Sequence, residues 1–493
     1  MRALWLKAIL KTDLVTLQHG ALCLSVQNPS FSFPTIPVTY SEDCLFIDVY
    51  APAEANRGSP GHGLPVMIWF QGGAFVQLFN PNYNGTGLID ASDGNVIVAS
   101  FNYRTGPYGF LANDELQAEG NLNTGLHDQR AAIKWVQRHI SAFGGDPDKI
   151  TLFGASVGGG SVLLQLLAYG GDEPCEDEVQ WRSGIAQSVY LPPVYCVKDM
   201  EFHYTELLNK TQCDDLECLR ALSTDALQSA NIATPPPGQP NIPIFGYGPV
   251  IDGQLLPDSP TSLLKQGRLA KDKPLIMGTS RTEGTIFAPQ AQNITAANQF
   301  VTTQLPKLTN ASLAQLQMLY NNTPSTLPGV QANVSSFFYY AAELYGDALF
   351  TCPTINSAAS LQSQDVPVHV FIDDIRDPVE VAAGYIVPHT WEVQAVWGPE
   401  YATQYVALPG ADSYDSGKSN AAIVSVVQSY WTHFVASGGD PNKVRSDMPV
   451  IWEDFERGQS LVLATNQTRM QAIDGDLLRK CAFWDSIAAQ IGH

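Results

Sequence analysis

A strand-like run that ends in Gly154-Ala155-Ser156-Val157-Gly158 constrains this chain more than any other feature. Residues 150–156 read ITLFGAS, and a small-residue, apolar helical pattern follows directly. A sharp turn from strand to helix needs residues without bulky side chains on both sides of it, which Gly154 and Gly158 supply. The pattern therefore predicts that Ser156 is a strained, exposed nucleophile, with the N–H of Val157 free to bind an oxyanion. The alternative is a glycine-rich turn with an incidental serine, which the flanking strand and helix patterns disfavour.

Short apolar runs alternate with helical patterns along the rest of the chain. The runs are 65–70, 95–103, 150–156, 274–280 and 368–374. Buried parallel strands have this composition. Residues 125–143 place apolar side chains at helical spacing, and 143–150 supply a Gly/Pro turn before the next strand. The fold class predicted is therefore α/β, with a mostly parallel central sheet that has helices on both faces. The Pro-rich stretch 234–249 reads as a surface loop.

A serine hydroxyl needs a base, and the base needs an acid that orients it. Among the nine histidines, His389 lies in a loop-like stretch after the predicted strand 368–374, whereas His369 lies inside that strand and reads as a packed residue. Glu283 follows the end of the predicted strand 274–280. The order Ser156, Glu283, His389 is the chain order of a nucleophile-elbow hydrolase. Taken alone, Glu283 also reads as a solvated turn residue and His389 as a structural histidine.

Composition excludes several classes of partner. The net charge is −21, with 45% hydrophobic residues. Such an acidic surface repels nucleic-acid phosphates and anionic lipid, so neither is an expected partner. No run reaches the ~18 apolar residues of a membrane span, and no CxxC pair suggests zinc. We expect no metal, no cofactor and no transmembrane segment, and a small-molecule substrate.

Cysteines and glycosylation sequons point to the secretory pathway. The chain has eight cysteines. Its seven Asn-x-Ser/Thr sequons begin at Asn84, Asn209, Asn293, Asn310, Asn321, Asn333 and Asn466. Together they indicate disulfides, glycosylation and secretion. The N-terminus MRALWLKAILKTDLV, however, lacks a clean signal peptide. We therefore expect a secreted protein whose true start is missing from this sequence.

Several stretches resemble the type-B carboxylesterase family, which contains cholinesterases and extracellular fungal lipases and esterases. They are SEDCLFIDVYAP (41–52), WFQGGAF (69–75), NYRTGPYGFLA (102–112), the long block 120–159 around Ser156, GPVIDGQLLPD (248–258), MGTSRTEGTIF (277–287), PHTWEVQAVWG (388–398) and CAFWDSI (481–487). The resemblance runs from about residue 20 to the C-terminus. It implies one α/β-hydrolase domain over 1–493 that lacks part of the family's N-terminal region.

The resemblance also implies roles for residues. Ser156 matches the nucleophile, His389 the general base and acid, and Glu283 the orienting acid. The backbone N–H groups of Gly73 and Ala74, with that of Val157, match the oxyanion hole. Three disulfides are implied by similarity, and the two remaining cysteines would form a fourth: Cys23–Cys44, Cys213–Cys218, Cys352–Cys481 and Cys175–Cys196.

The chain departs from the family pattern near the proposed site. Ala74 replaces the third glycine of the oxyanion loop, and Gln71 precedes the glycines. Ala155 and Val157 stand where the family favours Glu and Ala, and Thr390 stands where a glycine usually follows the histidine. The catalytic atoms are unchanged, so we expect function to survive.

Substrate class is suggested mainly by what is missing. The segment between Cys23 and Cys44 contains no Trp. Cholinesterases use one there to bind a quaternary ammonium by cation–π contact, so choline esters are disfavoured. That segment is also shorter than the lid of the family's interfacial lipases, which favours small or soluble esters. Candidates for an apolar pocket, each equally compatible with core packing, are Phe75, Phe245, Tyr247, Ile286, Phe287 and Trp391.

The predicted function is thus a serine hydrolase that cleaves carboxylic esters through an acyl-enzyme. An acyltransferase using the same triad is the first alternative, because the triad cannot distinguish water from another nucleophile. A non-catalytic binding protein is the second, although such relatives typically lose the serine or histidine. The sequence leaves the oligomeric state open.

Overall fold

The computed structural model describes residues 19–29, 31, 38–53, 55, 63–79, 83–175, 178–320, 334–402, 411–443 and 448–493. Residues 1–18, on which the expectation of a missing start rests, lie outside this part, as do the sequons at Asn321 and Asn333. No helix in the described part is both long and apolar enough to span a bilayer.

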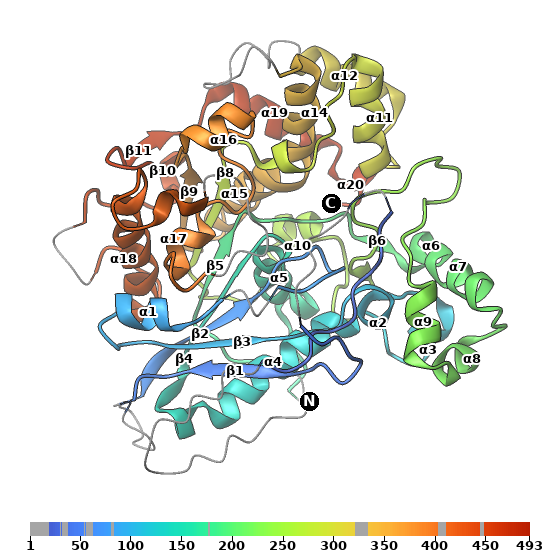
Figure 1. Ribbon diagram of the computed structural model, residues 1–493, viewed down its shortest axis with the longest axis horizontal. Helices are drawn as coiled ribbons and strands as arrows, with labels where there is room; N and C mark the ends of the chain where they lie inside the picture. Colours follow the sequence, from blue (N-terminus) through green and yellow to red (C-terminus); the bar gives the residue numbers. More distant parts are fainter. Residues whose placement is uncertain are drawn as a thin grey trace.

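A mostly parallel sheet runs through the molecule (Figure 1). Within the described residues it has nine strands, parallel except at its two edges, where β1 pairs with β3 and β10 with β11. The strands in spatial order are β1 (Ile47–Tyr50), β3 (Ile97–Phe101), β2 (Leu64–Phe70), β4 (Gly145–Ala155), β5 (Ser183–Gln187), β8 (Leu275–Ser280), β9 (Val368–Asp373), β10 (Gln459–Leu463) and β11 (Arg469–Ala472). All five predicted strands are present. A separate two-stranded ladder pairs β6 (Tyr195–Cys196) with β7 (Val250–Ile251).

Strand β4 begins earlier than the sequence predicts. The Gly/Pro turn expected over 143–150 ends sooner, because Gly145 already pairs with Leu64 of β2. The register then shifts between Leu64 and Val66, so residues 145–149 form an irregular entry to the strand.

Alternate side chains of the strands enter different hydrophobic clusters, as expected for a sheet buried on both faces. Val66, Ile68 and Phe70 of β2 belong to one cluster, and Met67 and Trp69 belong to the other. Helices packed in the first cluster include α4 (Thr124–His139), α5 (Val157–Leu166), α10 (Pro260–Gln266), α15 (Cys352–Gln362) and α19 (Gly475–Ser486). Those of the second are α1 (Thr86–Ala91), α17 (Val393–Trp397) and α18 (Ala421–Ser437), and α14 (Ser336–Gly346) contributes to both. The predicted two-faced arrangement is confirmed.

A smaller group of helices lies to the right of the sheet in Figure 1 and has its own apolar cluster. It comprises α3 (Asp114–Ala118), α6 (Val197–Met200), α7 (Phe202–Thr211), α8 (Leu216–Ala221) and α9 (Thr224–Ala230). The other α-helices in the described part of the chain are α2 (Gly106–Phe110), α11 (Ile294–Gln304), α12 (Asn310–Leu319), α16 (Pro378–Ala383) and α20 (Ala488–Ile491). Short 3₁₀ turns include η2 (Ile140–Phe143) and η4 (Glu283–Ile286), and the π-helical turn η5 (Asp347–Thr351) follows α14. The Pro-rich stretch 234–249 contains no helix or strand, as predicted.

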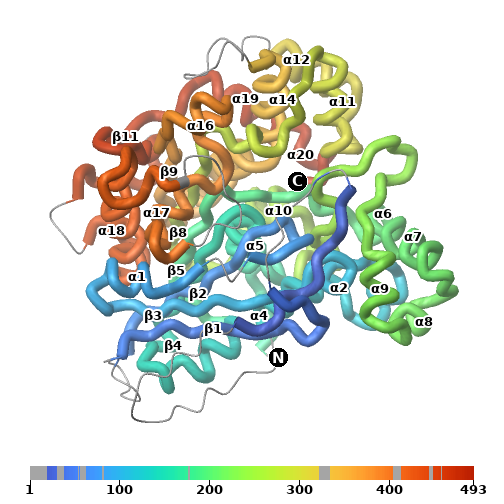
Figure 2. Tube along the Cα trace, viewed as in Figure 1, coloured from blue at the N-terminus to red at the C-terminus, as the bar shows by residue number. Residues whose placement is uncertain are grey.

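The C-terminus folds back onto the middle of the chain. In Figure 2 the chain end lies beside the segment that leads into β6. The backbone N–H of Val194 donates to the carbonyl of Gly492 at 2.6 Å, which fixes that contact.

Three of the four implied disulfides are confirmed: Cys23–Cys44, Cys213–Cys218 and Cys352–Cys481. The fourth, Cys175–Cys196, is wrong, because both cysteines are free and exposed. Cys196 precedes α6, and its Sγ lies 3.0 Å from Oδ2 of Asp199, to which it donates. The thiol therefore has a local partner in place of a second sulfur.

Candidate active site

Ser156 occupies the tight turn between β4 and α5. Its backbone has φ 60° and ψ −130°, a strained conformation for a residue with a side chain. A Cβ at Gly158 would lie 1.9 Å from the carbonyl oxygen of Phe70, and one at Gly154 would lie 2.5 Å from the same atom. Only glycine fits at both positions, so the small residues that surround the serine are required by close packing of the turn against β2.

His389 and Glu283 lie against each other in the interior. Nδ1 of His389 is 2.5 Å from Oε2 of Glu283, and both side chains are buried. The other carboxylate oxygen of Glu283 accepts the N–H of Ser280 at 2.5 Å and the hydroxyl of Thr279 at 3.0 Å. The carboxylate of Glu283 is thus held by residues at the end of β8, and it in turn holds Nδ1 of the imidazole. Nε2 of His389 is buried and has no hydrogen-bond partner among the described residues.

The end of β5 connects the serine turn to the histidine loop. Ala155 of β4 pairs with Gln187 of β5 in the parallel ladder. Ser156 and Ser188 are the next residues after this pair, at the ends of two neighbouring strands that lie about 4.8 Å apart. The N–H of Ser156 donates to the carbonyl of Gln187 at 2.9 Å. The hydroxyl of Ser188 accepts the N–H of Thr390, the residue after His389, at 3.1 Å. Sequence reasoning missed Ser188, because only the strand register shows that it lies between the two loops.

The loop of residues 71–79 lies against Ser156. A Cβ at Gly72 would be 3.1 Å from Cβ of the serine. Gly73, Ala74 and Phe75 all have positive φ, of 105°, 53° and 60°. Within the described residues, the backbone N–H groups of Gly73, Ala74 and Val157 donate no hydrogen bond. Free backbone N–H groups in a loop next to a nucleophile are the kind of donor that an oxyanion hole uses.

Two further buried carboxyl groups, those of Glu392 and Asp373, interact electrostatically with Glu283. Glu392 accepts a hydrogen bond from Nε2 of Gln187 at 3.1 Å, and its second oxygen is buried without a partner in the described part. Burial, with a smaller contribution from the charge of Glu283, raises the pKa of Glu392 to about 7. Burial first, and then the charge of Glu392, also raises the pKa of Asp373 well above its usual range. The sequence motifs did not predict this cluster.

Aromatic side chains cover the imidazole. The ring of Phe350 lies 4.6 Å from that of His389, and the ring of Phe287 lies 5.3 Å from it. Phe245 contacts Phe287 at 5.7 Å and Tyr190 at 5.4 Å. This set, Tyr190, Phe245, Phe287 and Phe350, is called the aromatic wall below. Phe245 and Phe287 are among the predicted pocket residues, whereas Tyr190 and Phe350 lack a sequence motif that could have identified them.

The other predicted pocket residues have different neighbours. Phe75 is buried against Phe110 at 4.6 Å. Tyr247 stacks on His203 at 4.2 Å. Trp391 contacts Tyr414 and belongs to the second cluster, whereas α5 packs in the first. Ile286 is half-buried against the first cluster.

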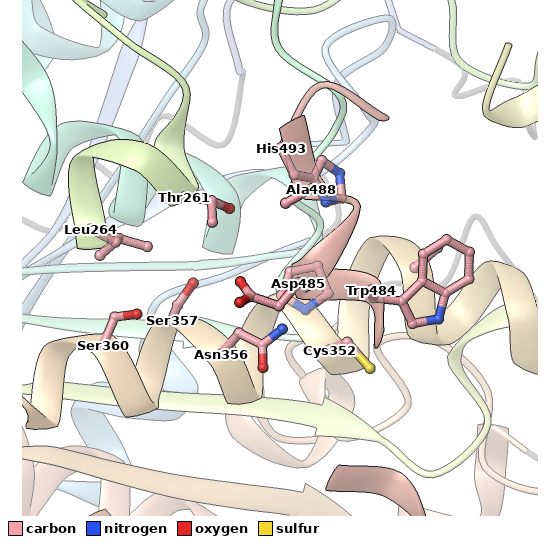
Figure 3. A pocket seen from close by; sticks show the side chains of 12 residues that line it. Thr261, Leu264, Cys352, Asn356, Ser357, Ser360, Trp484, Asp485, Ala488 and His493 are labelled. Atoms are coloured by element: carbon pink, nitrogen blue, oxygen red, sulfur yellow. The ribbon is translucent and has the colours of Figure 1, made fainter. Parts of the chain in front are cut away.

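A pocket lies away from these residues, between α10, α15 and the C-terminal helices (Figure 3). Asp485 in it forms an ion pair with Lys265 at 2.7 Å, and the amide of Asn356 donates to the carbonyl of Cys481 at 3.1 Å. Its lining includes none of Ser156, Glu283 and His389. In the described part of the chain, no cluster of three or more His, Cys, Asp or Glu side chains is arranged to hold a metal ion.

Comparison with known proteins places this geometry in context. The model of the carboxylesterase family matches residues 10–484. The crystal structure of Aspergillus niger EstA superposes with a TM-score of 0.87 at 35% identity, covering 96% of this chain and 88% of that one. The structure therefore has the α/β-hydrolase fold of that family.

Curated relatives are lipases and carboxylesterases. Lipase 1 of Geotrichum candidum is 37% identical over 67% of this chain, and carboxylesterase patB of Penicillium expansum is 30% identical over 91% of it. Bile salt-activated lipase of Bos taurus is 33% identical over 84%. The matches span 62% of the Geotrichum protein, 75% of the Penicillium protein and 70% of the bovine protein.

Proposed function

The chain belongs to the carboxylesterase family, and on that premise we propose that it hydrolyses carboxylic esters with Ser156 as nucleophile, His389 as general base and Glu283 as the acid that orients His389. The observation that carries the proposal is the pairing of His389 with Glu283 beside the serine turn. Because Nδ1 is held by the carboxylate, the unpartnered Nε2 is the nitrogen left to exchange a proton with Ser156.

The first half of the reaction forms an acyl-enzyme. Oγ of Ser156 attacks the ester carbonyl while Nε2 of His389 takes its proton. The carbonyl oxygen becomes an oxyanion and accepts hydrogen bonds from the N–H groups of Gly73, Ala74 and Val157. Each such donor lowers the barrier by roughly 3 kcal/mol. The alcohol leaves with the proton held by His389.

The second half repeats these steps with water. His389 takes a proton from a water molecule, which attacks the acyl carbon. The same N–H groups stabilise the second tetrahedral intermediate, and Oγ of Ser156 leaves with the proton. The Glu283 carboxylate accepts the hydrogen bond from Nδ1 and stabilises the imidazolium that forms in each half.

The aromatic wall supports esters with an apolar group next to the carbonyl. Phe287 and Phe350 lie directly against His389, so the part of a substrate that extends past the imidazole on that side meets aromatic rings. The segment between Cys23 and Cys44 has no Trp for a quaternary ammonium. Small or soluble apolar esters are therefore the proposed substrates. The three disulfides support a secreted protein.

Hydrolysis of p-nitrophenyl esters from acetate to decanoate tests this function. The protein is expected to hydrolyse the short to medium chains, and Ser156→Ala is expected to lose at least about 10³-fold in kcat. Ser161→Ala is the matched control, since Ser161 is a buried hydroxyl on the same helix whose only described role is to accept from Gln129 at 2.9 Å. Equal activity of S156A and the parent protein would contradict the proposal.

A further inference from the structure

The side chain of Gln71 is buried at the point where β2 ends and the glycines begin. It has no exposed surface, and three partners occupy its amide. Nε2 donates to the carbonyl of Phe101 at 2.7 Å and to Oδ1 of Asn102 at 3.2 Å, and Oε1 accepts the N–H of Phe79 at 2.6 Å. The backbone carbonyl of the same residue accepts the hydroxyl of Tyr103 at 3.0 Å.

The bond to Phe79 closes the base of the 71–79 loop. Gln71 and Phe79 are eight residues apart, and Gly73 and Ala74 lie between them. Inside the loop, the carbonyl of Gly73 accepts the N–H groups of Val76 and Gln77 at 2.9 and 3.0 Å. The amide therefore holds the outer ends together while these two bonds shape the tip.

The loop needs such support because its backbone is strained. Ala74 and Phe75 have φ of 53° and 60°, a left-handed conformation that is disfavoured for residues with a side chain. Strained conformations of this kind persist only where the surroundings enforce them. A loop released at its base would relax and redirect the N–H groups of its tip.

The same network reaches the Cys23–Cys44 segment. Asn102, which accepts from Gln71, donates through Nδ2 to the carbonyls of Cys44 and Ala21, both at 3.0 Å. From the other side, the N–H of Val26 donates to the carbonyl of Val76 at 3.0 Å. Gln71 thus joins the loop to β3 and to the disulfide-closed segment.

We propose that Gln71 is a positioning residue for the oxyanion hole: its side-chain amide fixes the 71–79 loop so that the N–H groups of Gly73 and Ala74 point at the oxyanion formed on the Ser156 adduct. The inference rests on the proposed function. Since those N–H groups bind charge that exists only in the transition state, loss of the amide lowers kcat and leaves KM nearly unchanged.

The tests use two isosteric variants and a matched control. Gln71→Met removes every side-chain hydrogen bond, and Gln71→Glu keeps an acceptor for Phe79 but loses the donor to Phe101. Gln165→Met is the control. Gln165 is equally buried, and its amide bonds Gln129 and Arg130 at 3.1 and 3.2 Å, away from the loop. Both Met variants leave buried polar groups unpaired, so both lose thermal stability.

Two measurements separate a loss of positioning from a loss of stability. One is the kinetics of p-nitrophenyl butyrate hydrolysis, and the other is inhibition by a trifluoromethyl ketone, which forms a tetrahedral serine adduct. Gln71→Met is expected to lose about 10- to 100-fold in kcat, with KM within twofold, and to weaken the ketone by the same factor. Gln165→Met is expected to stay within twofold in kcat. Gln71→Glu, which keeps one of the bonds, is expected to fall between the parent protein and Gln71→Met.

Two results would overturn the inference. One is a kcat for Gln71→Met within twofold of the parent or of Gln165→Met. The other, decisive if Gln71→Met does not fold, is a folded Gln71→Glu with unchanged kcat and unchanged ketone affinity. Failure of the proposed function is a different outcome, because S156A would then be as active as the parent protein.

Discussion

Replacing the buried acid Glu392 by Gln tests the electrostatics behind the candidate site. Glu392 is fully buried, with one oxygen bonded to Gln187 and the other without a described partner. Burial and the nearby Glu283 raise its pKa from 4.5 to about 7. Gln has nearly the same shape and never ionises, so the variant removes the cost of charging this position and, with it, the contribution of the Glu392 charge to the raised pKa of Asp373.

The sign follows from proton linkage. Between pH 4.5 and about 7 the folded protein holds a proton on Glu392 that the unfolded chain has released. The contribution of Glu392 to the free energy of unfolding of the parent therefore falls as the pH rises through that window, and this contribution is constant outside it. A shift of about 2.5 units at 1.36 kcal/mol per unit corresponds to about 3 kcal/mol. Glu392→Gln is expected to gain up to that amount over the parent between pH 4.5 and pH 8.

Denaturant unfolding of both proteins at pH 5, 6, 7 and 8 measures the difference. Glu380 and Glu343, whose pKa values burial also raises to about 7, contribute equally to both proteins and cancel. Glu400→Gln removes the same charge from an exposed position and serves as control. A difference between Glu392→Gln and the parent that stays constant from pH 5 to pH 8 would refute the reasoning.

Three further predictions concern the site and its scaffold. Ala74→Gly is expected to keep kcat/KM within about threefold of the parent, and Ala74→Val to lose at least about tenfold, because a β-branched residue is strongly disfavoured at φ 53°. Equal kinetics for the two variants would count against a role for the backbone conformation of residue 74. Ser188→Ala leaves the N–H of Thr390 without its partner, so kcat is expected to fall about fivefold to tenfold at unchanged KM, corresponding to about 1 kcal/mol; a rise in KM alone would point to a different role. The double variant Cys352→Ser with Cys481→Ser removes a disulfide that closes a loop with a sequence separation of 129, so the free energy of unfolding is expected to fall by about 5 kcal/mol through chain entropy. An unchanged Tm in calorimetry would contradict this expectation.

Much of the fold is readable from local sequence. The Val/Ile-rich runs predict β2, β3, β4, β8 and β9, since buried parallel strands require continuous apolar stretches. The glycines around Ser156 predict its turn, because the steric demand is local. In the same way, the position of Glu283 after β8 and of His389 after β9 follows from where strands end.

Long-range contacts are what the sequence does not reveal. Phe350 reaches His389 from the π-helical turn η5, and Ser188 meets Thr390 across more than two hundred residues of chain. Nothing near either residue in the sequence signals those contacts. Gln71 was visible only as an unusual residue before the glycines. Its three amide bonds depend on how β3 and the loop end converge in space.

Trp391 shows how little proximity in sequence says about the contacts of a side chain. It lies two residues after His389, yet its ring packs with Tyr414 in the hydrophobic cluster that does not contain Phe287 and Phe350. The predicted pairing of Cys175 with Cys196 rests only on their being the two cysteines left after the three implied disulfides. The structure leaves both as exposed thiols.

Labelling with a fluorophosphonate, followed by peptide mass mapping, tests the central claim most directly, since it requires no choice of ester. The proposed mechanism predicts one adduct, on Ser156, and a large loss of labelling rate in His389→Ala, because in that mechanism Nε2 of His389 removes the serine proton. No adduct on Ser156 in folded protein, or equal labelling of the parent and His389→Ala, would contradict the account.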